Sequence, residues 1–479
     1  MTTDDSGPVP PWLRAVWPRA AILATTAAIL FTGLITLRRF PNSADEYSYM
    51  VSAELFARGT LSVPSPEPRE FFDFIHVVNN GRYFGKYPPG WPAILCVGVL
   101  AGVPSLVAPL LGVGVLVLLY RLALENFSRE EADLTLLVAF CNPFLVFNAA
   151  SFFSHLPCLF FVTLTLYLGF RLLRNPEPAS VWAALGAAGG AAFLIRPYTA
   201  VAFLLPLAAF LGLRVAPGLP RRQRLRNLAA AAGPAVAAVG ALMLYNVALG
   251  GGAITGPYGQ FDTMYRLGRQ PGSEDWAWGF RYNLLERMAD LTAWIPCSGI
   301  LLALMWFRRD QREDPRRVLL ILMFVSLLGA QFIFLRHPGN QYGPRYVLEA
   351  WSVVVLLMAG ALRSWKKAGA IAAALVLVGN LTMFVLQTRY FSGQVRERTE
   401  VYEAVRRAGL SKAIVFLDTG SGGMPPGDLT RNGVDFKGEV LYVHHRGLNN
   451  WELKARYPGR KSFVFRYDPE TKSGSLTPD

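Results

Sequence analysis

Charge is scarce in this 479-residue chain: Asp, Glu, Lys and Arg make up only 17% of the residues, and apolar side chains make up 52%. The mean hydropathy is +0.31. An ordinary soluble protein of this length carries more charge and fewer apolar residues. The composition therefore predicts a polytopic membrane protein.

Cysteine is also scarce, and a phosphate-binding glycine loop is missing. The four cysteines all lie within apolar runs without a CxxC pair, at Cys96, Cys141, Cys158 and Cys297. We interpret them as small core residues and not as disulfides or metal ligands. The glycines 250–252 follow an apolar run and open a loop, which is a helix-breaking pattern. The sequence gives no support to nucleotide hydrolysis.

Long runs without charge are abundant. A bilayer core is spanned by about 20 apolar residues, and 20–37 carries no charge and no small-residue cleavage site before Arg38. We interpret it as a retained first span. Further uncharged runs are 87–120, 134–170, 178–195, 197–213, 227–249, 291–307, 318–335, 350–362 and 368–388. Two of these runs are longer than one membrane-spanning helix. The run 134–170 is expected to break near Asn148–Pro157. The run 87–120 is expected to hold an interfacial piece from Trp91 and a span from about residue 105. The total is about eleven transmembrane helices.

Arginine clusters set the expected orientation. Two short connections, 214–226 and 308–317, each hold five arginines, which is typical of cytoplasmic loops. Alternate threading then predicts a cytoplasmic N-terminus at 1–19, a membrane domain at 20–388 with an outer loop at 38–90, and an extracytoplasmic domain at 389–479. The net charge of +14 follows mostly from this topology, so the anionic partner is expected to be membrane lipid and not nucleic acid.

The outer loop 38–90 carries the first candidate residues. Ser43 and Glu46 form a capping-box pattern, and Gly59 is a stop signal, so a helix is predicted over 44–57. This gives Glu46 a structural interpretation. Asp45 could complement the helix dipole, or it could act as a general base beside the exit of a span, where partial desolvation tunes its pKa. Both interpretations of Asp45 stay open at this point.

Three basic positions share the predicted outer face. Lys86 precedes two prolines that stiffen the backbone, although a lysine anchor at the membrane interface has the same pattern. Arg196 stands alone between two uncharged runs and could hold a phosphate group or be an ordinary interfacial arginine. Arg345 and Tyr346 likewise place an arginine before an apolar run and could contact the substrate. Alternatively, they could belong to the aromatic belt at the membrane interface. His155 has no partner at metal-ligand spacing, so a structural role is favoured and no metal site is predicted.

These motifs resemble the membrane-embedded glycosyltransferases of the C superfold. They are an acidic pair in the first outer loop, Gly81-Arg-Tyr83 with Lys86-Tyr-Pro-Pro-Gly90, and Arg196-Pro197 between later spans. The nearest branch is similar to the protein O-mannosyltransferases and lipid A aminoarabinose transferases. The resemblance implies a polyprenyl-phosphate sugar as donor, inversion at the sugar, and a glycan, lipid or protein acceptor in the cell envelope. It also implies that Asp45 is the catalytic aspartate and that Lys86 and Arg196 contact the carrier phosphate.

Around those residues we expect Glu46 at the catalytic centre and Arg345, His155, Tyr83 and Tyr346 at the substrate. Two departures from the family pattern stand out. Ser154-His155 occupies a turn where relatives often carry an acid, and Tyr87 separates the lysine from the prolines. A requirement for a divalent ion stays open, and no cofactor is predicted.

The C-terminal segment 389–479 changes character, because charge rises and long apolar runs end. A helix is expected over Gln394–Ala408, strands over 413–417, 440–443 and 462–467, and a helix over 449–456, which together make a small α/β domain. Two other function classes compete with the transferase. A transporter or flippase should show internal repeats and charges in mid-span, and a non-catalytic assembly protein would leave Asp45 and Arg196 replaceable.

Overall fold

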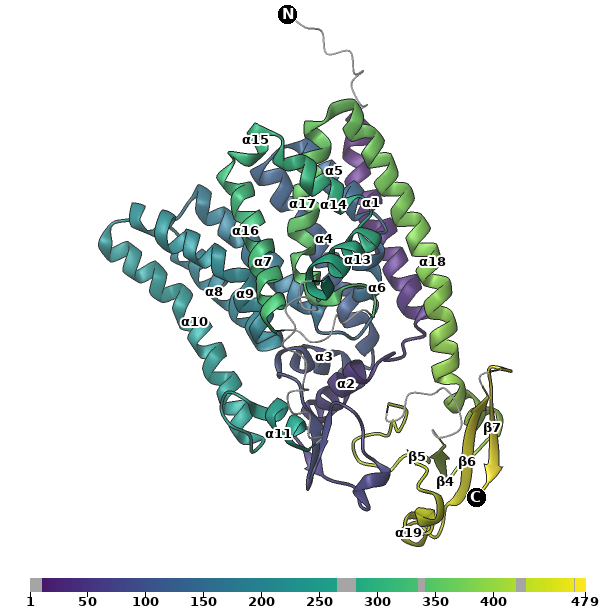
Figure 1. Ribbon diagram of the computed structural model, residues 1–479. Helices are drawn as coiled ribbons and strands as arrows, with labels where there is room; N and C mark the ends of the chain where they lie inside the picture. The colour runs from purple at the N-terminus through teal and green to yellow at the C-terminus, as the bar shows by residue number, and fades with distance from the viewer. Residues whose placement is uncertain (1–10, 265–280, 335–340, 419–427, 469) are drawn as a thin grey trace, which may run out of the picture.

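A bundle of long helices makes up most of the molecule, and smaller elements cover one end of it (Figure 1). The computed structural model describes residues 11–264, 281–334, 341–418, 428–468 and 470–479. The helices in these ranges are α1 (Pro11–Phe31), α2 (Ala44–Ala57), α3 (Gly90–Leu100), α4 (Val107–Asn126), α5 (Arg129–Ala139), α6 (Pro143–Ala149), α7 (His155–Arg174), α8 (Ala179–Ile195), α9 (Pro197–Phe210), α10 (Arg221–Ala248), α11 (Gly256–Met264), α13 (Arg287–Trp294), α14 (Ser298–Trp306), α15 (Arg309–Arg312), α16 (Pro315–Phe334), α17 (Trp351–Ser364), α18 (Lys366–Arg407) and α19 (Asn450–Arg456). The strands are β1 (Val63–Pro64), β2 (Val77–Asn79), β3 (Arg82–Gly85), β4 (Ala413–Leu417), β5 (Val440–His444), β6 (Lys461–Asp468) and β7 (Ser473–Pro478).

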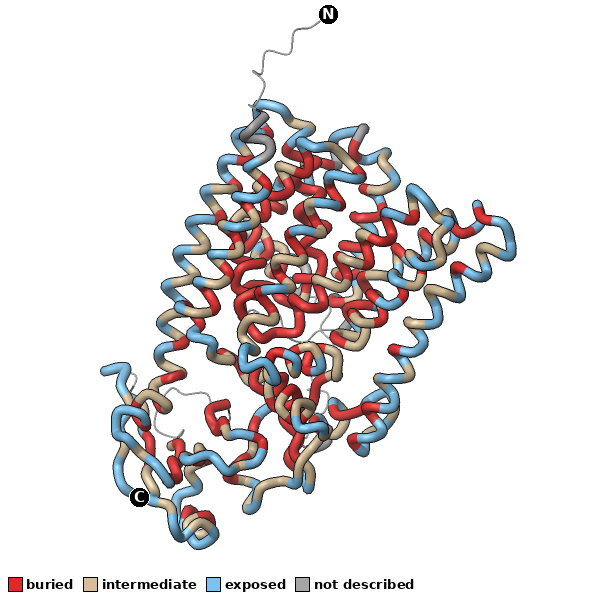
Figure 2. Tube along the Cα trace, turned by 180° about the vertical axis from the view of Figure 1, so that it is seen from behind, coloured by how far each residue is buried: buried red, intermediate tan, exposed pale blue. Residues whose placement is uncertain are grey.

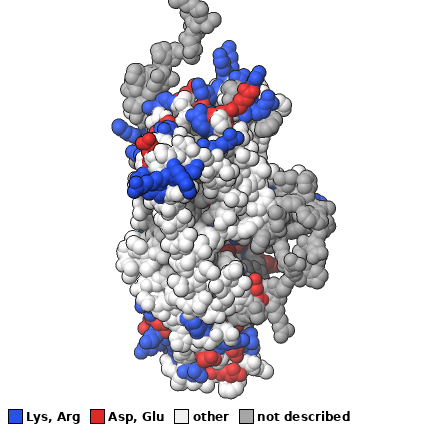
Figure 3. Space-filling model, turned by 90° about the vertical axis from the view of Figure 1, so that its left-hand side faces the viewer, with Lys and Arg blue, Asp and Glu red and all other residues white. Residues whose placement is uncertain are grey.

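The bundle has the dimensions of a polytopic membrane domain. Seven helices of the described part are long and apolar enough to cross a bilayer, and up to nine spans result if two bent helix pairs each count as one. Figure 3 shows a broad band without charged side chains between two charged ends. The expected membrane protein is thus confirmed. The count of eleven stays a prediction, because it also needs the 17-residue α8 and the 20-residue α16 to cross.

The bent pairs explain where long apolar runs break. The run 134–170 breaks between α6 and α7, inside the predicted window. A further break between α5 and α6 bends the chain by 66°, where Cys141 has a positive φ of 47° and Pro143 begins α6. The run 291–307 also bends, by 103° between α13 and α14, at Pro296 and at Cys297 with φ 66°. Proline and left-handed residues interrupt the helical hydrogen bonds there.

The segment between α1 and α3 folds as predicted at its start. The Ser43 hydroxyl accepts a hydrogen bond from the Glu46 amide at 3.2 Å and caps α2, and Gly59 follows the helix with φ 70°. The predicted helix over 44–57 is therefore confirmed. An Asn80-Gly81 turn, with Gly81 at φ 74°, then joins β2 and β3, in a small antiparallel sheet of order β1-β3-β2.

The C-terminal part forms a mixed four-stranded sheet of order β5-β4-β6-β7. β4 lies parallel to β5 and β6, and β7 pairs antiparallel to β6. The three predicted strands and the short helix are confirmed. The strand β7 was not predicted. The expected helix over Gln394–Ala408 is present, but it is the end of α18, which is one helix of 42 residues. The predicted boundary at 388/389 falls inside it, since no proline interrupts this stretch.

The small sheets and α2 and α11 gather at the end of the bundle opposite the start of α1. Figure 1 places α15 near the N-terminal end, and α2, α11 and the C-terminal sheet at the other. Phe71 and Phe72 of the segment after α2 are buried against the C-terminal sheet and its loop, with ring centroids 6.2 Å from Phe416 and 5.3 Å from Phe436. Figure 2 shows the buried residues along the inner faces of the helices and exposed residues along the outer sides. The segment 38–90 and the C-terminal part therefore share a hydrophobic interface.

A buried amide holds the bent helices together inside the bundle. The Asn142 side chain is fully buried, donates to the Trp294 carbonyl at 3.1 Å and to Asn380 Oδ1 at 2.9 Å, and its Oδ1 accepts from Trp351 Nε1 at 3.0 Å. Asn380 in turn donates to the carbonyl of Val138 at 2.9 Å. One side chain thus joins four separate segments where water cannot satisfy them.

We expect Asn142→Ala to destabilise the protein by about 1–3 kcal/mol, because its buried partners lose their hydrogen bonds. The check is the unfolding midpoint of purified protein in detergent, compared with Asn449→Ala, a change at an exposed asparagine. An unchanged midpoint for Asn142→Ala would contradict this role of the amide.

Candidate functional site

Asp45 lies in the first turn of α2 and is surrounded by groups from distant parts of the chain. Its side chain is 21% exposed, and one carboxylate oxygen lies 3.5 Å from the Arg345 guanidinium. The other oxygen accepts a hydrogen bond from the Tyr87 hydroxyl and lies 3.8 Å from His76 Nε2. The Ser43 cap fixes the turn that presents this carboxylate.

The surroundings keep Asp45 ionised. Burial alone would raise its pKa, but Arg345, the Tyr87 hydrogen bond and Lys86 together hold the pKa of Asp45 below its ordinary value. Burial lowers the pKa of His76 to about 4, so this ring is neutral near pH 7 and its contact with Asp45 is not an ion pair. The site therefore presents a carboxylate at neutral pH.

Glu46 has a different position from its neighbour. Its carboxyl is fully buried and accepts a hydrogen bond at 2.9 Å from the Phe152 amide, in the turn between α6 and α7. Burial raises the pKa of Glu46 to about 7. This side chain fastens α2 to the bundle. Its position fits the structural interpretation of Glu46, and no contact in the described residues points to a catalytic role.

Lys86 is enclosed by aromatic rings. Its Nζ lies 4.1 Å from the ring centroid of Phe261 and 5.3 Å from that of Tyr258, both on α11. Burial lowers the pKa of Lys86 to about 8, although Asp45 and Asp262 act in the opposite direction. A cation over aromatic faces is attracted by their quadrupoles, so the rings hold the ammonium in place.

Arg196 joins α8 and α9 and forms a buried ion pair. Its Nε lies 2.9 Å from Glu349 Oε1, and the Glu349 side chain is fully buried. Burial would lower the pKa of Arg196, but Glu349 and other nearby groups raise it. Arg196 Nη1 also donates to Ser154 Oγ at 3.4 Å, and that hydroxyl lies 2.8 Å from the Tyr49 hydroxyl on α2. The guanidinium is thereby oriented from two sides.

A shared aromatic ring connects the two arginines of this end. The Arg196 and Arg345 guanidinium carbons lie 5.6 Å and 5.4 Å from the Tyr346 ring centroid. The His155 ring lies 5.6 Å from that of Tyr346, and within the described part neither of its nitrogens has a hydrogen-bond partner. The structure thus brings Asp45, Lys86, Arg196, Arg345, Tyr346 and His155 to one end of the bundle and into a connected set of contacts, which we call the Asp45 cluster.

Tyr83 lies outside the Asp45 cluster. It is 1% exposed, sits on β3, and packs against Phe436 with ring centroids 5.1 Å apart. The neighbouring hydrophobic residues come from α2, the small sheet and the C-terminal segment. The structure therefore gives this ring a packing role and not a position beside Asp45.

Sequence reasoning missed four residues that contact or orient the Asp45 cluster: Tyr49, His76, Tyr87 and Glu349. Only Glu349 left a readable signal, because it is an acid at the entry to an apolar run, four residues after Arg345. Within the ranges that the structure describes, no group of three or more His, Cys, Asp or Glu could hold a metal ion. The arrangement offers one carboxylate that can accept a proton and three fixed cations that can hold an anion.

Comparisons with known proteins give a family match for part of the chain and a fold match for nearly all of it. Residues 96–246 match the family described as dolichyl-phosphate-mannose-protein mannosyltransferase. No curated protein matches the chain by sequence. Among solved structures, ArnT from Cupriavidus metallidurans in the apo state has a TM-score of 0.62 at 14% identity, with 96% of this chain and 93% of that chain covered.

Two other structures share the fold. ArnT from the same organism bound to undecaprenyl phosphate gives a TM-score of 0.58 at 13% identity, with coverage of 96% and 93%. The oligosaccharyltransferase of Archaeoglobus fulgidus gives 0.53 at 10% identity, with 96% of this chain and 70% of that chain covered. The resemblance inferred from the sequence motifs is confirmed by these matches: residues 96–246 match the dolichyl-phosphate-mannose-protein mannosyltransferase family, and the chain has the same fold as ArnT and the archaeal oligosaccharyltransferase.

Proposed function

We propose that the chain transfers a sugar from a polyprenyl-phosphate donor to an envelope glycan, lipid or protein, on the outer face of the membrane and with inversion. The observation that carries this proposal is the ionised Asp45 carboxylate among Lys86, Arg196 and Arg345 at one end of the bundle. The family match and the ArnT structure bound to undecaprenyl phosphate support the choice of donor.

Asp45 is the general base of the proposed reaction. An acceptor hydroxyl is a weak nucleophile at neutral pH, and a carboxylate that removes its proton during attack accelerates such reactions by about 10²–10⁴-fold. The carboxylate is oriented by Tyr87 and Arg345. Attack from the face opposite the phosphate inverts the sugar carbon.

The cations stabilise the leaving group. The bond between sugar and phosphate breaks during attack, and the carrier phosphate takes the bonding electrons and gains negative charge. Arg196 is already oriented by Glu349 and Ser154, and Lys86 by the aromatic rings of α11. Groups fixed before the reaction stabilise this charge without reorganisation.

Donor binding also activates the base. In the free protein Lys86 and Arg345 lower the pKa of Asp45, which keeps it ionised but makes it a weak base. A bound phosphate neutralises part of this positive charge, so the pKa of Asp45 rises when the donor is present. The base therefore gains strength only when the sugar is in place.

The topology completes the proposal. The arginine-rich connections lie away from the Asp45 cluster, which supports a cytoplasmic position for them and an outer position for Asp45. The segment 389–479 is then extracytoplasmic. Its contact with the loop after α2 suits a role in holding the acceptor near Asp45.

Asp45→Asn should reduce sugar transfer by about 10²–10⁴-fold while the protein still folds, because the amide cannot accept the acceptor proton. The measurement is transfer of labelled sugar from a panel of polyprenyl-phosphate sugars to an envelope-glycan extract by the protein in lipid. Asp435→Asn, at a surface aspartate paired with Arg58, is the matched control. Transfer that survives in Asp45→Asn would remove Asp45 from the mechanism.

Sugar transfer should decline as the pH rises through about 8. Lys86, with its pKa lowered to about 8 by burial, is charged below this pH and neutral above it, and only the charged form stabilises the leaving phosphate. The pH profile of kcat/KM reports this pKa in the free enzyme. In Lys86→Arg, kcat/KM should not decline over this pH range, because the guanidinium stays charged. An identical alkaline limb in both proteins would assign the titration to another group.

Glu349→Gln should raise the KM for the donor, because Arg196 loses the carboxylate that orients it. Glu349→Ala should also destabilise the protein by about 3–5 kcal/mol, the range for breaking a buried ion pair on one side. Glu177→Gln, at an exposed glutamate, is the control. An unchanged KM in a Glu349→Gln protein would restrict Glu349 to a structural role.

A further inference from the structure

A cavity lies away from the Asp45 cluster, between α2, the chain after α1, and α18. Its volume is about 350 Å³. The lining residues are Arg38, Arg39, Phe40, Pro41, Tyr47, Met50, Glu54, Thr399, Tyr402, Glu403, Arg406 and Arg431. None of them belongs to the Asp45 cluster. Tyr47, Met50 and Glu54 share one face of α2 by helical spacing, whereas Asp45 and Tyr49 lie on another.

The cavity carries uncompensated positive charge. Four arginines and two glutamates line it, a net charge of +2. Glu403 already pairs with Arg406 at 3.1 Å, and Glu54 accepts a hydrogen bond from the Val434 backbone. The acids are thus occupied, so positive charge remains for a ligand.

Arg38 and Arg39 are the accessible cations of this cavity. Both are exposed, and both have left-handed backbones with φ of 53° and 55°. Consecutive non-glycine residues in this conformation are uncommon, and such positions gather at functional sites. Neither forms an ion pair within the described residues. Their conformation places two unpaired guanidinium groups at the rim of one cavity.

Arg431 is the buried cation. It is 9% exposed, donates from Nη1 to the Pro41 carbonyl at 2.5 Å and from Nε to the Asp428 carbonyl at 2.9 Å, and its guanidinium carbon lies 4.3 Å from the Phe40 ring centroid. Its Nη2 is buried without a hydrogen-bond partner in the described part of the chain. A buried donor of this kind needs an acceptor, which an anionic ligand would supply.

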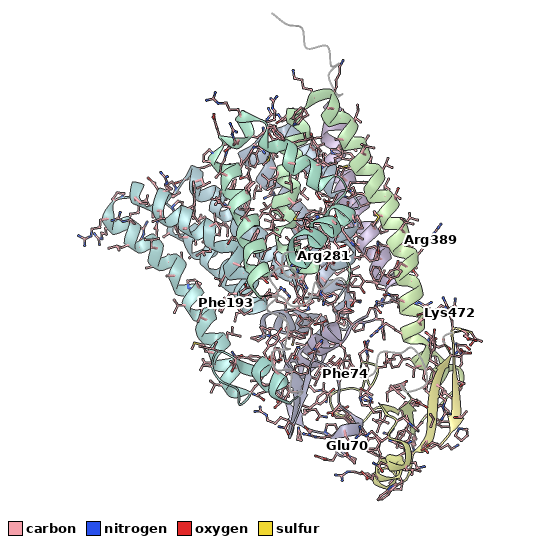
Figure 4. All side chains as sticks on the ribbon, in the orientation of Figure 1. Glu70, Phe74, Phe193, Arg281, Arg389 and Lys472 are labelled. Carbon is pink, nitrogen blue, oxygen red and sulfur yellow. The ribbon has the colours of Figure 1, made fainter. Side chains whose placement is uncertain are left out.

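The position of the cavity indicates the depth of the ligand in the membrane. The candidate span Val16–Thr36 ends two residues before Arg38. On the other wall, α18 continues past the bundle to the C-terminal sheet, where Lys472 lies 3.7 Å from Glu397 of that helix (Figure 4). Phe40, Pro41, Met50 and Tyr402 add apolar lining beside the arginines. Cations next to apolar groups at the end of a span suit a lipid headgroup and the start of its chains.

We propose that this cavity binds the phosphate headgroup of an anionic membrane lipid, independently of the sugar donor. The lipid joins the end of α1, α2 and α18, and so holds the C-terminal part against the membrane surface. This binding site goes beyond the proposed transfer reaction, because its residues and the Asp45 cluster lie on different faces of α2.

The test is lipid binding by the full-length protein, measured by native mass spectrometry in detergent with added phosphatidylglycerol or phosphatidylcholine and no sugar donor. We expect preferential binding of phosphatidylglycerol and a fall in its affinity of roughly 30-fold in Arg38→Gln/Arg39→Gln, because each basic side chain near an anionic headgroup contributes about fivefold. Inorganic phosphate at millimolar concentration should not displace the lipid.

Two further variants make the result decisive. Arg221→Gln/Arg222→Gln removes an exposed arginine pair from α10 and should leave binding unchanged. Met50→Trp fills the cavity without altering charge and should also weaken binding, which keeps the proposal testable if the first double variant does not fold. Unchanged affinity in the folded cavity variants, equal binding of both lipids, or displacement by inorganic phosphate would each overturn it. Loss of Asp45-dependent transfer alone would bear only on the proposed function.

Discussion

The structure of this protein depends most on a charge balance: an ionised Asp45 carboxylate held among cations that come from separate parts of the chain. Asp45 belongs to α2, Lys86 precedes α3, Arg196 joins α8 to α9, and Arg345 precedes α17. Like charges at this density repel each other, so the arrangement needs the compensating acids Asp45 and Glu349. The long helices of the bundle bring these four charged residues together at one end of the molecule.

Sequence patterns predicted which residues reach this end, because hydrophobic thickness and arginine-rich connections determine where each run begins and ends. Asp45, Lys86, Arg196 and Arg345 all follow from that reasoning. The contacts between them do not. Tyr87 reaches Asp45 across 42 positions and Arg345 across 300, and such pairings follow from helix packing, which no local pattern encodes.

Two differences between the sequence patterns and the structure have local causes. A rise in charge after residue 388 suggested a new domain, yet α18 continues because charged side chains on an exposed helix are good helix formers and no proline interrupts it. Tyr83 lies in a motif that resembles a substrate-binding stretch, yet its position on β3 directs the ring toward Phe436. A strand alternates the direction of its side chains, so neighbours in a motif can face different surroundings.

The helix α2 links the two charged regions mechanically. One face presents Asp45 and Tyr49 to the Asp45 cluster, and the other presents Tyr47, whose hydroxyl donates to the Asn432 carbonyl at 2.5 Å and accepts from the Asn432 amide at 2.8 Å. Glu46, between these faces, is fastened to Phe152. A rigid helix transmits displacement along its axis. A change in how the C-terminal segment contacts Tyr47 would therefore move Asp45 relative to the arginines. A ligand that fixes this contact would keep the Asp45 carboxylate at its position beside the cations.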